Sequence, residues 1–330
     1  MKINKFIILV LLIILSCSLL AQPGEQPSGS GTENDPYLVG ILNNLYWMTE
    51  NSGEWDKYYI QTSNIDASSS SAWDDGQGFT SIGNNSIKFT GSYDGGGYTI
   101  NGLTINRPST AFIGLFGYTI GSTIKDIGVI NVNITGGNRT GGLAGWIIIN
   151  TTINNCYTTG NITGADRTGG LIGMVDDSST VHNCYSTSNV NGRGNDVGGL
   201  VGKNISSSIS NCYSTGSVVS SEGIRIGGLV GFSYSGAVIN CYSTGSVTGP
   251  NFVGGIIGFG SGGYTVSSLF WNIDDFSTDN GIGTGITTME MMDAYTFCFA
   301  GWDFEEDENG NDNGTTGGTN GNGTDNWWDM

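Results

Sequence analysis

One unit of about 28 residues recurs along the chain, and it limits the possible folds more than any other feature. The pattern Gly-Gly-[Leu or Ile]-x-Gly occurs five times, and the first glycines of successive copies are 28, 29, 29 and 27 residues apart. The copies begin at Gly141, Gly169, Gly198, Gly227 and Gly254. Between them Asn-Cys-Tyr recurs, with its four cysteines 28, 28 and 29 residues apart. Two motifs that share one period indicate a repeat protein, in which each unit buries its apolar residues against the next.

The composition of each unit favours strands over helices. Thr, Val, Ile, Ser and Asn form runs of four to six residues that are separated by turn residues, whereas helical repeats need longer runs of good helix formers. We therefore expect an all-β fold, a right-handed parallel β-helix (β-solenoid) of about 28-residue coils, with short helical and aromatic caps. Equivalent residues of successive coils would lie over one another, about 4.8 Å apart.

The chain divides into four predicted regions. They are a signal peptide (1–21), an N-terminal linker and cap (22–78), the repeat β-helix (79–276) and a C-terminal cap with an acidic, Gly- and Asn-rich insertion (277–330). Caps are expected because the open strand edges of a solenoid invite aggregation. A short amphipathic helix around Leu42–Tyr46 would cover one end, and a capping box at Thr287–Glu290 would start a helix at the other.

The first 21 residues have the pattern of a secretory signal. Lys2 and Lys5 precede the apolar stretch 6–15, and a short cleavage region ends at Ala21. We therefore expect a secreted or cell-surface protein, with lipid attachment at Cys17 as the alternative to cleavage after Ala21. No later apolar run approaches the roughly 20 residues of a transmembrane helix, so no transmembrane segment is expected in the mature chain.

Charge and histidine content argue against several functional classes. The chain has 29 acidic and 11 basic residues, a formal charge of -18, which makes nucleic acid a poor partner. His182 is the only histidine, so no His-rich metal site can form. We expect no cofactor, with Ca²⁺ on the acidic run 303–312 as an alternative.

The repeated motifs carry a family resemblance. The five Gly-Gly-[Leu or Ile]-x-Gly copies, with Asn-Cys-Tyr-[Ser or Thr]-Thr between them, resemble the GLUG-motif repeats of bacterial exported proteins. Residues 89–100 resemble the opening coil of such proteins, and residues 301–304 resemble their closing segment. That motif occurs in surface and secreted proteins, including some IgA-cleaving peptidases, where it lies outside the catalytic domain. The resemblance therefore implies a scaffold rather than a reaction.

Stacking would turn the Asn-Cys-Tyr motif into columns. The cysteines are Cys156, Cys184, Cys212 and Cys241, and the asparagines are Asn155, Asn183, Asn211 and Asn240. We expect the cysteines to form a ladder of buried thiols, with bridges between coils or metal binding as alternatives. The asparagines would hydrogen-bond from coil to coil at a corner whose left-handed backbone Asn tolerates.

Two further columns are candidate binding stripes. The first contains Tyr157, Tyr185, Tyr213 and Tyr242, and the second contains Arg139, Arg167, Asp196 and Arg225. If the cysteines point inward, alternation places the tyrosines outside, as a platform for sugar rings or peptide side chains, unless they pack at a corner. The second column lies two residues before each Gly-Gly, and we expect a salt-bridged surface column there. Binding of anionic sugars or carboxylates is the alternative.

These observations favour a non-enzymatic scaffold. A repetitive body without an interrupting catalytic loop suggests cell-surface adhesion or the binding of an extracellular polymer, either polysaccharide or surface protein. One alternative is a polysaccharide lyase or hydrolase of the pectin-degrading β-helix type, which rests on fold analogy alone. The other is a purely structural module of a larger surface assembly.

Overall fold

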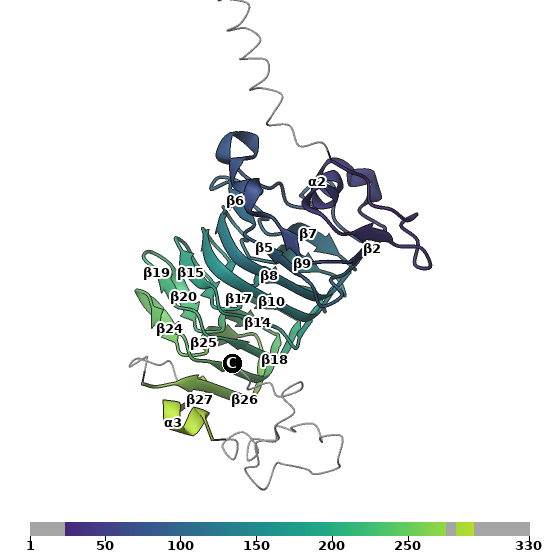
Figure 1. The fold of residues 1–330 in the computed structure, drawn as a ribbon. Coiled ribbons are helices and arrows are strands. Elements are labelled where there is room, and N and C mark those ends of the chain that lie inside the picture. Colours follow the sequence, from purple (N-terminus) through teal and green to yellow (C-terminus); the bar gives the residue numbers. More distant parts are fainter. Residues whose placement is uncertain (1–23, 275–281, 294–330) are drawn as a thin grey trace, which may run out of the picture.

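The computed structural model describes residues 24–274 and 282–293, which form a stack of parallel strands (Figure 1). Three sheets run along the stack, with 17, six and four strands. The six-stranded sheet contains β7 (Phe116–Ile120), β9 (Ala144–Ile148), β12 (Ile172–Val175), β17 (Val201–Ile205), β21 (Val230–Tyr234) and β25 (Ile257–Ser261). The four-stranded sheet contains β11 (Thr168–Gly169), β16 (Val197–Gly198), β20 (Ile224–Gly227) and β24 (Asn251–Gly254).

The 17-stranded sheet runs through all the coils. Its strands are β1 (Tyr37–Val39), β2 (Tyr58–Gln61), β3 (Ile65–Asp66), β4 (Ser92–Asp94), β5 (Thr99–Asn101), β6 (Thr104–Asn106), β8 (Thr123–Thr135), β10 (Thr152–Gly164), β13 (Thr180–His182), β14 (Tyr185–Ser186), β15 (Asn189–Gly192), β18 (Ser208–Ser214), β19 (Val218–Ser220), β22 (Ala237–Ser243), β23 (Val247–Thr248), β26 (Thr265–Asn272) and β27 (Thr284–Ile286). Because β1 to β3 already belong to this sheet, parallel pairing begins upstream of the predicted boundary at residue 79.

The strand register confirms the parallel β-helix and its period. Tyr157 pairs with Tyr185, Tyr185 with Tyr213, and Tyr213 with Tyr242, each one coil further along the chain. Leu171 and Leu200 of the Gly-Gly-Leu motifs are fully buried and lie on consecutive coils. The backbone N–H of Leu171 donates to the carbonyl of Leu200 at 2.9 Å, and Leu143, Leu200 and Leu229 make the same bond at the same distance. Burying each leucine side chain contributes roughly 1.5–3 kcal/mol.

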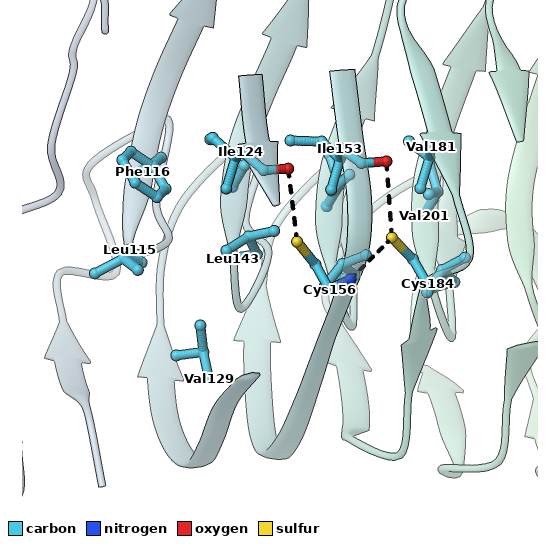
Figure 2. Close-up of a cluster of buried hydrophobic side chains, with 14 of the residues drawn as sticks. Leu115, Phe116, Ile124, Val129, Leu143, Ile153, Cys156, Val181, Cys184 and Val201 are labelled. Atoms are coloured by element: carbon cyan, nitrogen blue, oxygen red, sulfur yellow. Dashed lines mark hydrogen bonds between the residues drawn. The ribbon is translucent and has the colours of Figure 1, made fainter. Parts of the chain in front are cut away.

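The cysteines line the interior beside these aliphatic residues (Figure 2). Cys156, Cys184, Cys212 and Cys241 are free thiols, each exposed by 1% or less. The backbone N–H of Cys156 donates to Sγ of Cys184 at 3.4 Å, so the ladder is held by weak hydrogen bonds rather than by bridges. Burial raises the pKa of the Cys156 thiol well above its ordinary value, which keeps this thiol protonated.

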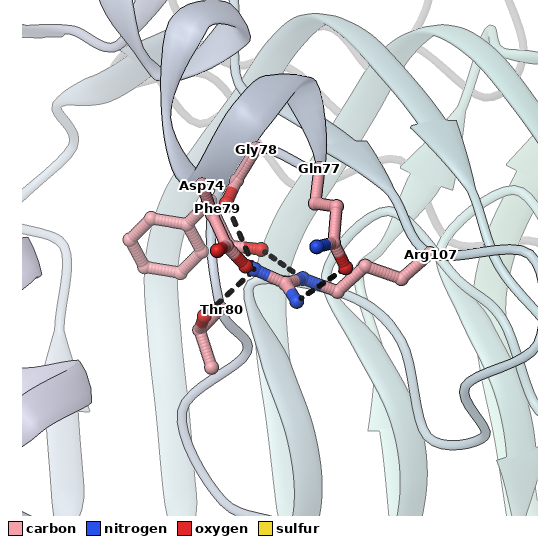
Figure 3. A network of polar contacts seen from close by, with 6 residues as sticks. All are labelled: Asp74, Gln77, Gly78, Phe79, Thr80 and Arg107. Atoms are coloured by element: carbon pink, nitrogen blue, oxygen red, sulfur yellow. Dashed lines mark hydrogen bonds and ion pairs between the residues drawn. The ribbon is translucent and has the colours of Figure 1, made fainter.

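The N-terminal end carries a cap that does not follow the repeat. The expected helix is α2 (Leu42–Glu50), which buries Leu42, Leu45 and Met48. A loop beyond it is fixed by Arg107, whose side chain is only 14% exposed (Figure 3). The guanidinium contacts the carboxylate of Asp74 at 2.8 Å, Oγ1 of Thr80 at 3.0 Å, the carbonyls of Gly78 and Phe79 at 3.1 and 3.3 Å, and Oε1 of Gln77 at 3.2 Å.

The other end carries α3 (Thr288–Met291), which begins at the predicted capping box. The backbone N–H of Glu290 donates to Oγ1 of Thr287 at 3.2 Å, and the backbone N–H of Thr287 donates to the Glu290 carboxylate at 2.8 Å. The predicted signal peptide, the lipid-attachment alternative at Cys17, the closing segment 301–304 and the acidic run 303–312 lie outside the described residues.

Candidate functional site

The corner that precedes each Gly-Gly has a left-handed backbone. Arg139, Arg167 and Asp196 each have a φ of 62°, and Arg225 has a φ of 68°. Phe112 and Phe252 occupy the same corner at the two ends of the column, with φ of 62° and 48°. In each of six consecutive coils, one side chain therefore projects from a corner that has this left-handed backbone.

A second column lies directly beside this corner, on the six-stranded sheet. Its members are Tyr118, Trp146, Met174, Lys203, Phe232 and Phe259, which pair in register from coil to coil. The last five immediately follow the last glycine of a Gly-Gly-[Leu or Ile]-x-Gly copy, and Tyr118 follows Gly117 of the related stretch 113–117. We call the two columns together the arginine-aromatic face: Phe112, Tyr118, Arg139, Trp146, Arg167, Met174, Asp196, Lys203, Arg225, Phe232, Phe252 and Phe259.

Aromatic rings and a guanidinium pack together at the N-terminal end of this face. The Tyr118 and Trp146 rings stack with their centroids 4.4 Å apart, and Phe112 stacks on Tyr118 at 5.3 Å. The Arg139 guanidinium lies 4.6 Å from the Trp146 ring centroid. Lys88 places its ammonium 5.2 Å from the Tyr118 ring centroid. A cation over an aromatic face is attracted by about 0.5–1 kcal/mol, and by more where water is displaced.

The C-terminal end repeats this arrangement. The Arg225 guanidinium lies 4.4 Å from the Phe232 ring centroid, and the Lys203 ammonium lies 5.1 Å from it. Phe252 and Phe259 pack edge to face at 5.2 Å. Phe252 is 53% exposed, so this end also presents an apolar ring to solvent.

Asp196 differs from its expected place on the surface, because it is only 2% exposed. Its carboxylate lies 2.5 Å from Nε of Arg225 and 4.0 Å from Nζ of Lys203. A Cβ on Gly231 would lie 2.6 Å from the carbonyl carbon of Asp196, so the bare glycine lets this corner approach the next coil closely. Burial raises the pKa of Asp196, and Arg225 and Lys203 oppose that rise.

Arg139 and Arg167 have no carboxylate of the described chain in direct contact, although Asp176 acts on Arg139 and Asp196 acts on Arg167 from a longer distance. Within the described residues, neither guanidinium donates a hydrogen bond or lies within 4.0 Å of a carboxylate, and the Nε atom of each is buried without a partner. Burial and the neighbouring Arg167 lower the pKa of Arg139, which marks two like charges held close together. These two side chains therefore leave strong donors unused.

The cations of the protein are concentrated on this face. Eleven Lys and Arg residues occur in the chain, and all except Lys2 and Lys5 lie in the described part. Five of these nine belong to the face or border it: Lys88, Arg139, Arg167, Lys203 and Arg225. Lys57, Arg107 and Lys125 pair with aspartates, and Arg193 donates to the Gly136 carbonyl at 3.3 Å.

The tyrosine column lies on the 17-stranded sheet, apart from this face. The rings of Tyr157, Tyr185, Tyr213 and Tyr242 stack at 4.7, 4.7 and 4.9 Å, with interplanar angles of 7°, 4° and 10°. The ring of Tyr157 also covers Gly128, where a Cβ would lie 2.3 Å from its Cζ. Burial raises the pKa of Tyr185 to about 12. Because each ring face contacts the next ring, the column presents edges rather than the open faces on which sugars stack.

Sequence reasoning named the corner column but missed its neighbours. Tyr118, Trp146, Lys203, Phe232 and Phe259 were absent from the candidate residues, although each directly follows a repeat motif or, for Tyr118, the related stretch 113–117. Reading that one position across all coils would have revealed a second column of aromatic and cationic side chains. Among residues 24–274 and 282–293, no three His, Cys, Asp or Glu side chains gather as they would to hold a metal. In the same range no helix has the length and apolar character needed to cross a membrane.

The chain contains GLUG motifs: residues 194–219 and 222–248 match the GLUG motif model. Halomucin of Haloquadratum walsbyi is 37% identical over 139 residues, and a protein named as a Gly-rich membrane protein of Evansella cellulosilytica is 36% identical over 112 residues. These alignments cover 40% and 33% of this chain. The matched region spans only 2% and 12% of the lengths of those two relatives.

Two solved structures share the fold. A candidate immunoglobulin A1 protease from Bacteroides ovatus superposes with a TM-score of 0.59 and 21% identity, over 86% of this chain and 93% of that one. A structure described as IgA1 protease superposes with a TM-score of 0.55 and 19% identity, over 76% of this chain and 21% of that one. At these identities the likeness shows the β-helix fold alone.

Proposed function

We propose that this GLUG-motif β-helix is an exported, non-enzymatic scaffold that binds an extracellular polymer through the arginine-aromatic face. One observation carries the proposal: an acidic protein gathers five of the nine described cations along one face and leaves two of them without a hydrogen bond or a close ion pair. Cations that served only solubility would be dispersed and paired. The names of the two sequence relatives, halomucin and a Gly-rich membrane protein, are consistent with a location at the cell surface.

Immobilised polymers test this function directly. The chain, produced without residues 1–21, is applied to an array of polysaccharides and extracellular matrix proteins, and bound protein is measured. We expect saturable binding to at least one polymer class, and no shortening of that polymer on prolonged incubation. The absence of binding to every polymer on the array would favour a purely structural module. Release of reducing or unsaturated sugar ends would instead establish the lyase or hydrolase alternative.

A further inference from the structure

We propose that the polymer is an anionic polysaccharide that lies parallel to the axis of the stack, with its carboxylate or sulfate groups on Arg139 and Arg167. This inference rests on the proposed function and specifies its ligand. Arg139 and Arg167 occupy equivalent corners of adjacent coils, about 4.8 Å apart along the axis. A guanidinium presents a planar fork of donors that matches the two oxygens of a carboxylate or sulfate.

The environment of the two guanidinium groups favours an anion between them. Arg139 is held against Trp146 and Phe112, so its charge is only partly hydrated. Arg167 adds a like charge nearby, and burial with this repulsion lowers the pKa of Arg139. An oxyanion bound by both groups would relieve the repulsion and supply the acceptors that the described residues lack.

The rings at either end of the face offer apolar surface to a sugar chain. Trp146 is half-buried beside Arg139, and Phe252 is 53% exposed at the other end of the face. Tyr234 is 47% exposed, and its ring centroid lies 6.4 Å from that of Phe232. Aromatic rings pack against the C–H faces of pyranose rings, whereas the charged groups of the polymer need the guanidinium forks. Cations flanked by rings therefore suit a ligand that carries both kinds of surface.

The charge spacing favours a polysaccharide over other polyanions. The face offers one corner side chain per coil, or about one per 4.8 Å, and Asp196 removes one cation from those available. Duplex DNA carries one charge per about 1.7 Å of its axis, a density that this acidic protein would repel. A sugar chain with one charged group per residue matches the coil spacing. Because the contacts repeat along the axis, affinity should rise with the length of the oligosaccharide.

The substitution Arg139→Asn with Arg167→Asn tests the assignment. Asn removes both charges but tolerates the left-handed backbone, so the variant keeps its corners. Lys57→Gln with Lys125→Gln is the charge-matched control, since it removes two cations that pair with aspartates and do not belong to the face. Thermal unfolding checks that both variants fold. Binding is measured at several NaCl concentrations to polygalacturonate, dextran sulfate, neutral dextran, single-stranded DNA and polyglutamate.

We expect the wild-type chain and the control to bind polygalacturonate or dextran sulfate, more weakly as salt rises. The Arg139→Asn and Arg167→Asn variant should bind at least about tenfold more weakly, because hydrogen bonds to charged groups contribute roughly 1.5–3 kcal/mol each. The preference between polygalacturonate and dextran sulfate distinguishes a carboxylate from a sulfate ligand.

Several results would overturn the inference. They are an equal loss in the control, full binding by the Arg139→Asn and Arg167→Asn variant, or equal binding of DNA or polyglutamate. Binding of neutral dextran or a matrix protein alone would preserve the proposed function while rejecting an anionic ligand. Failure to bind every probe here and on the array would reject both.

Discussion

Two corners of each coil share a left-handed backbone but differ in what their side chains can do. Asn155, Asn183, Asn211 and Asn240 have φ of 52–53°, and Arg139, Arg167 and Arg225 have φ of 62–68°. An amide carries a donor and an acceptor, so stacked asparagines satisfy one another. A guanidinium carries donors only, so stacked arginines need partners from outside their column. At the first corner Asn155, Asn211 and Asn240 each donate to a side chain of the preceding coil, whereas at the second corner the guanidinium groups meet Asp196 or aromatic rings.

The asparagine column has a defined direction. Nδ2 of Asn240 donates to Oδ1 of Asn211, and Nδ2 of Asn211 donates to Oδ1 of Asn183, both at 3.3 Å. At the N-terminal end, Nδ2 of Asn155 donates to the carboxylate of Asp126 at 2.7 Å. A carboxylate only accepts, so it ends the column without an unused donor.

The largest expected effect comes from deleting one side chain in each column. Asn211→Ala and Arg167→Ala each place an alanine in a left-handed backbone. The difference between their free energies of unfolding therefore reports the interactions of the side chains that were removed. Asn211→Ala removes two amide bonds and should lower the free energy of unfolding by about 1–3 kcal/mol more than Arg167→Ala. Urea unfolding followed by circular dichroism measures this difference. Equal losses would mean that the asparagine bonds contribute nothing.

A second effect concerns the one acid within the arginine column. Asp196→Asn keeps a residue suited to the corner but frees Arg225 and Lys203, with Arg167 nearby, from their carboxylate. We expect affinity for dextran sulfate at pH 7.5 to rise about threefold, as a partly exposed ion pair contributes up to about 1 kcal/mol. Equilibrium binding by fluorescence anisotropy gives the ratio, and unchanged or weaker binding would contradict the expectation.

The same residue gives a pH dependence with a defined sign. Because burial raises the pKa of Asp196 above its ordinary 3.8, the folded chain holds this proton more tightly than the unfolded chain. This contribution to the stability of the fold is fully present below the ordinary pKa of 3.8. It is lost as the pH rises through the raised pKa of Asp196 in the folded chain. Protonation also frees Arg225 and Lys203, so wild-type affinity for dextran sulfate should increase as the pH falls from 7.5 toward the raised pKa of Asp196. The Asp196→Asn variant should show a smaller increase, to which Asp176 contributes because burial raises its pKa as well, and parallel curves would exclude Asp196 as the cause.

The smallest effect is expected where the asparagine column ends. Asp126→Asn still offers Oδ1 to Asn155 and loses only an exposed ion pair with Lys125 at 3.2 Å. The free energy of unfolding should fall by about 0.2–0.5 kcal/mol. Asp126→Ala removes the acceptor as well and is the comparison variant. A loss as large as that of Asn211→Ala would show that charge, rather than acceptor capacity, fixes the end of the column.

The period of the sequence predicted most of the fold and four of the twelve residues of the candidate face. Equal spacing of Gly-Gly and Asn-Cys-Tyr was enough to predict parallel stacking, because only in-register coils align both motifs. It could not predict the burial of Asp196, which depends on Gly231 and Arg225 in the following coil. The exposure of a side chain depends on contacts between neighbouring coils, whereas a sequence motif describes residues within a single coil.

The N-terminal cap was less predictable for a related reason. Arg107 donates to five acceptors 27 to 33 residues earlier, a separation close to the coil period, but no motif marks these partners. The loop that it binds has positive φ at Asp74 and Asp75, a local path that residue spacing does not encode. Its shape follows from the contacts of one side chain rather than from repetition.

The backbone bonds between successive leucines have a consequence for how such a chain can change. Each coil bonds through Leu143, Leu171, Leu200 and Leu229 only to its immediate neighbours, with the same geometry every time. Duplicating or deleting one repeat unit in the gene would therefore leave the backbone hydrogen bonds between the remaining coils intact. The number of units, rather than any single residue, would then set the length of the arginine-aromatic face.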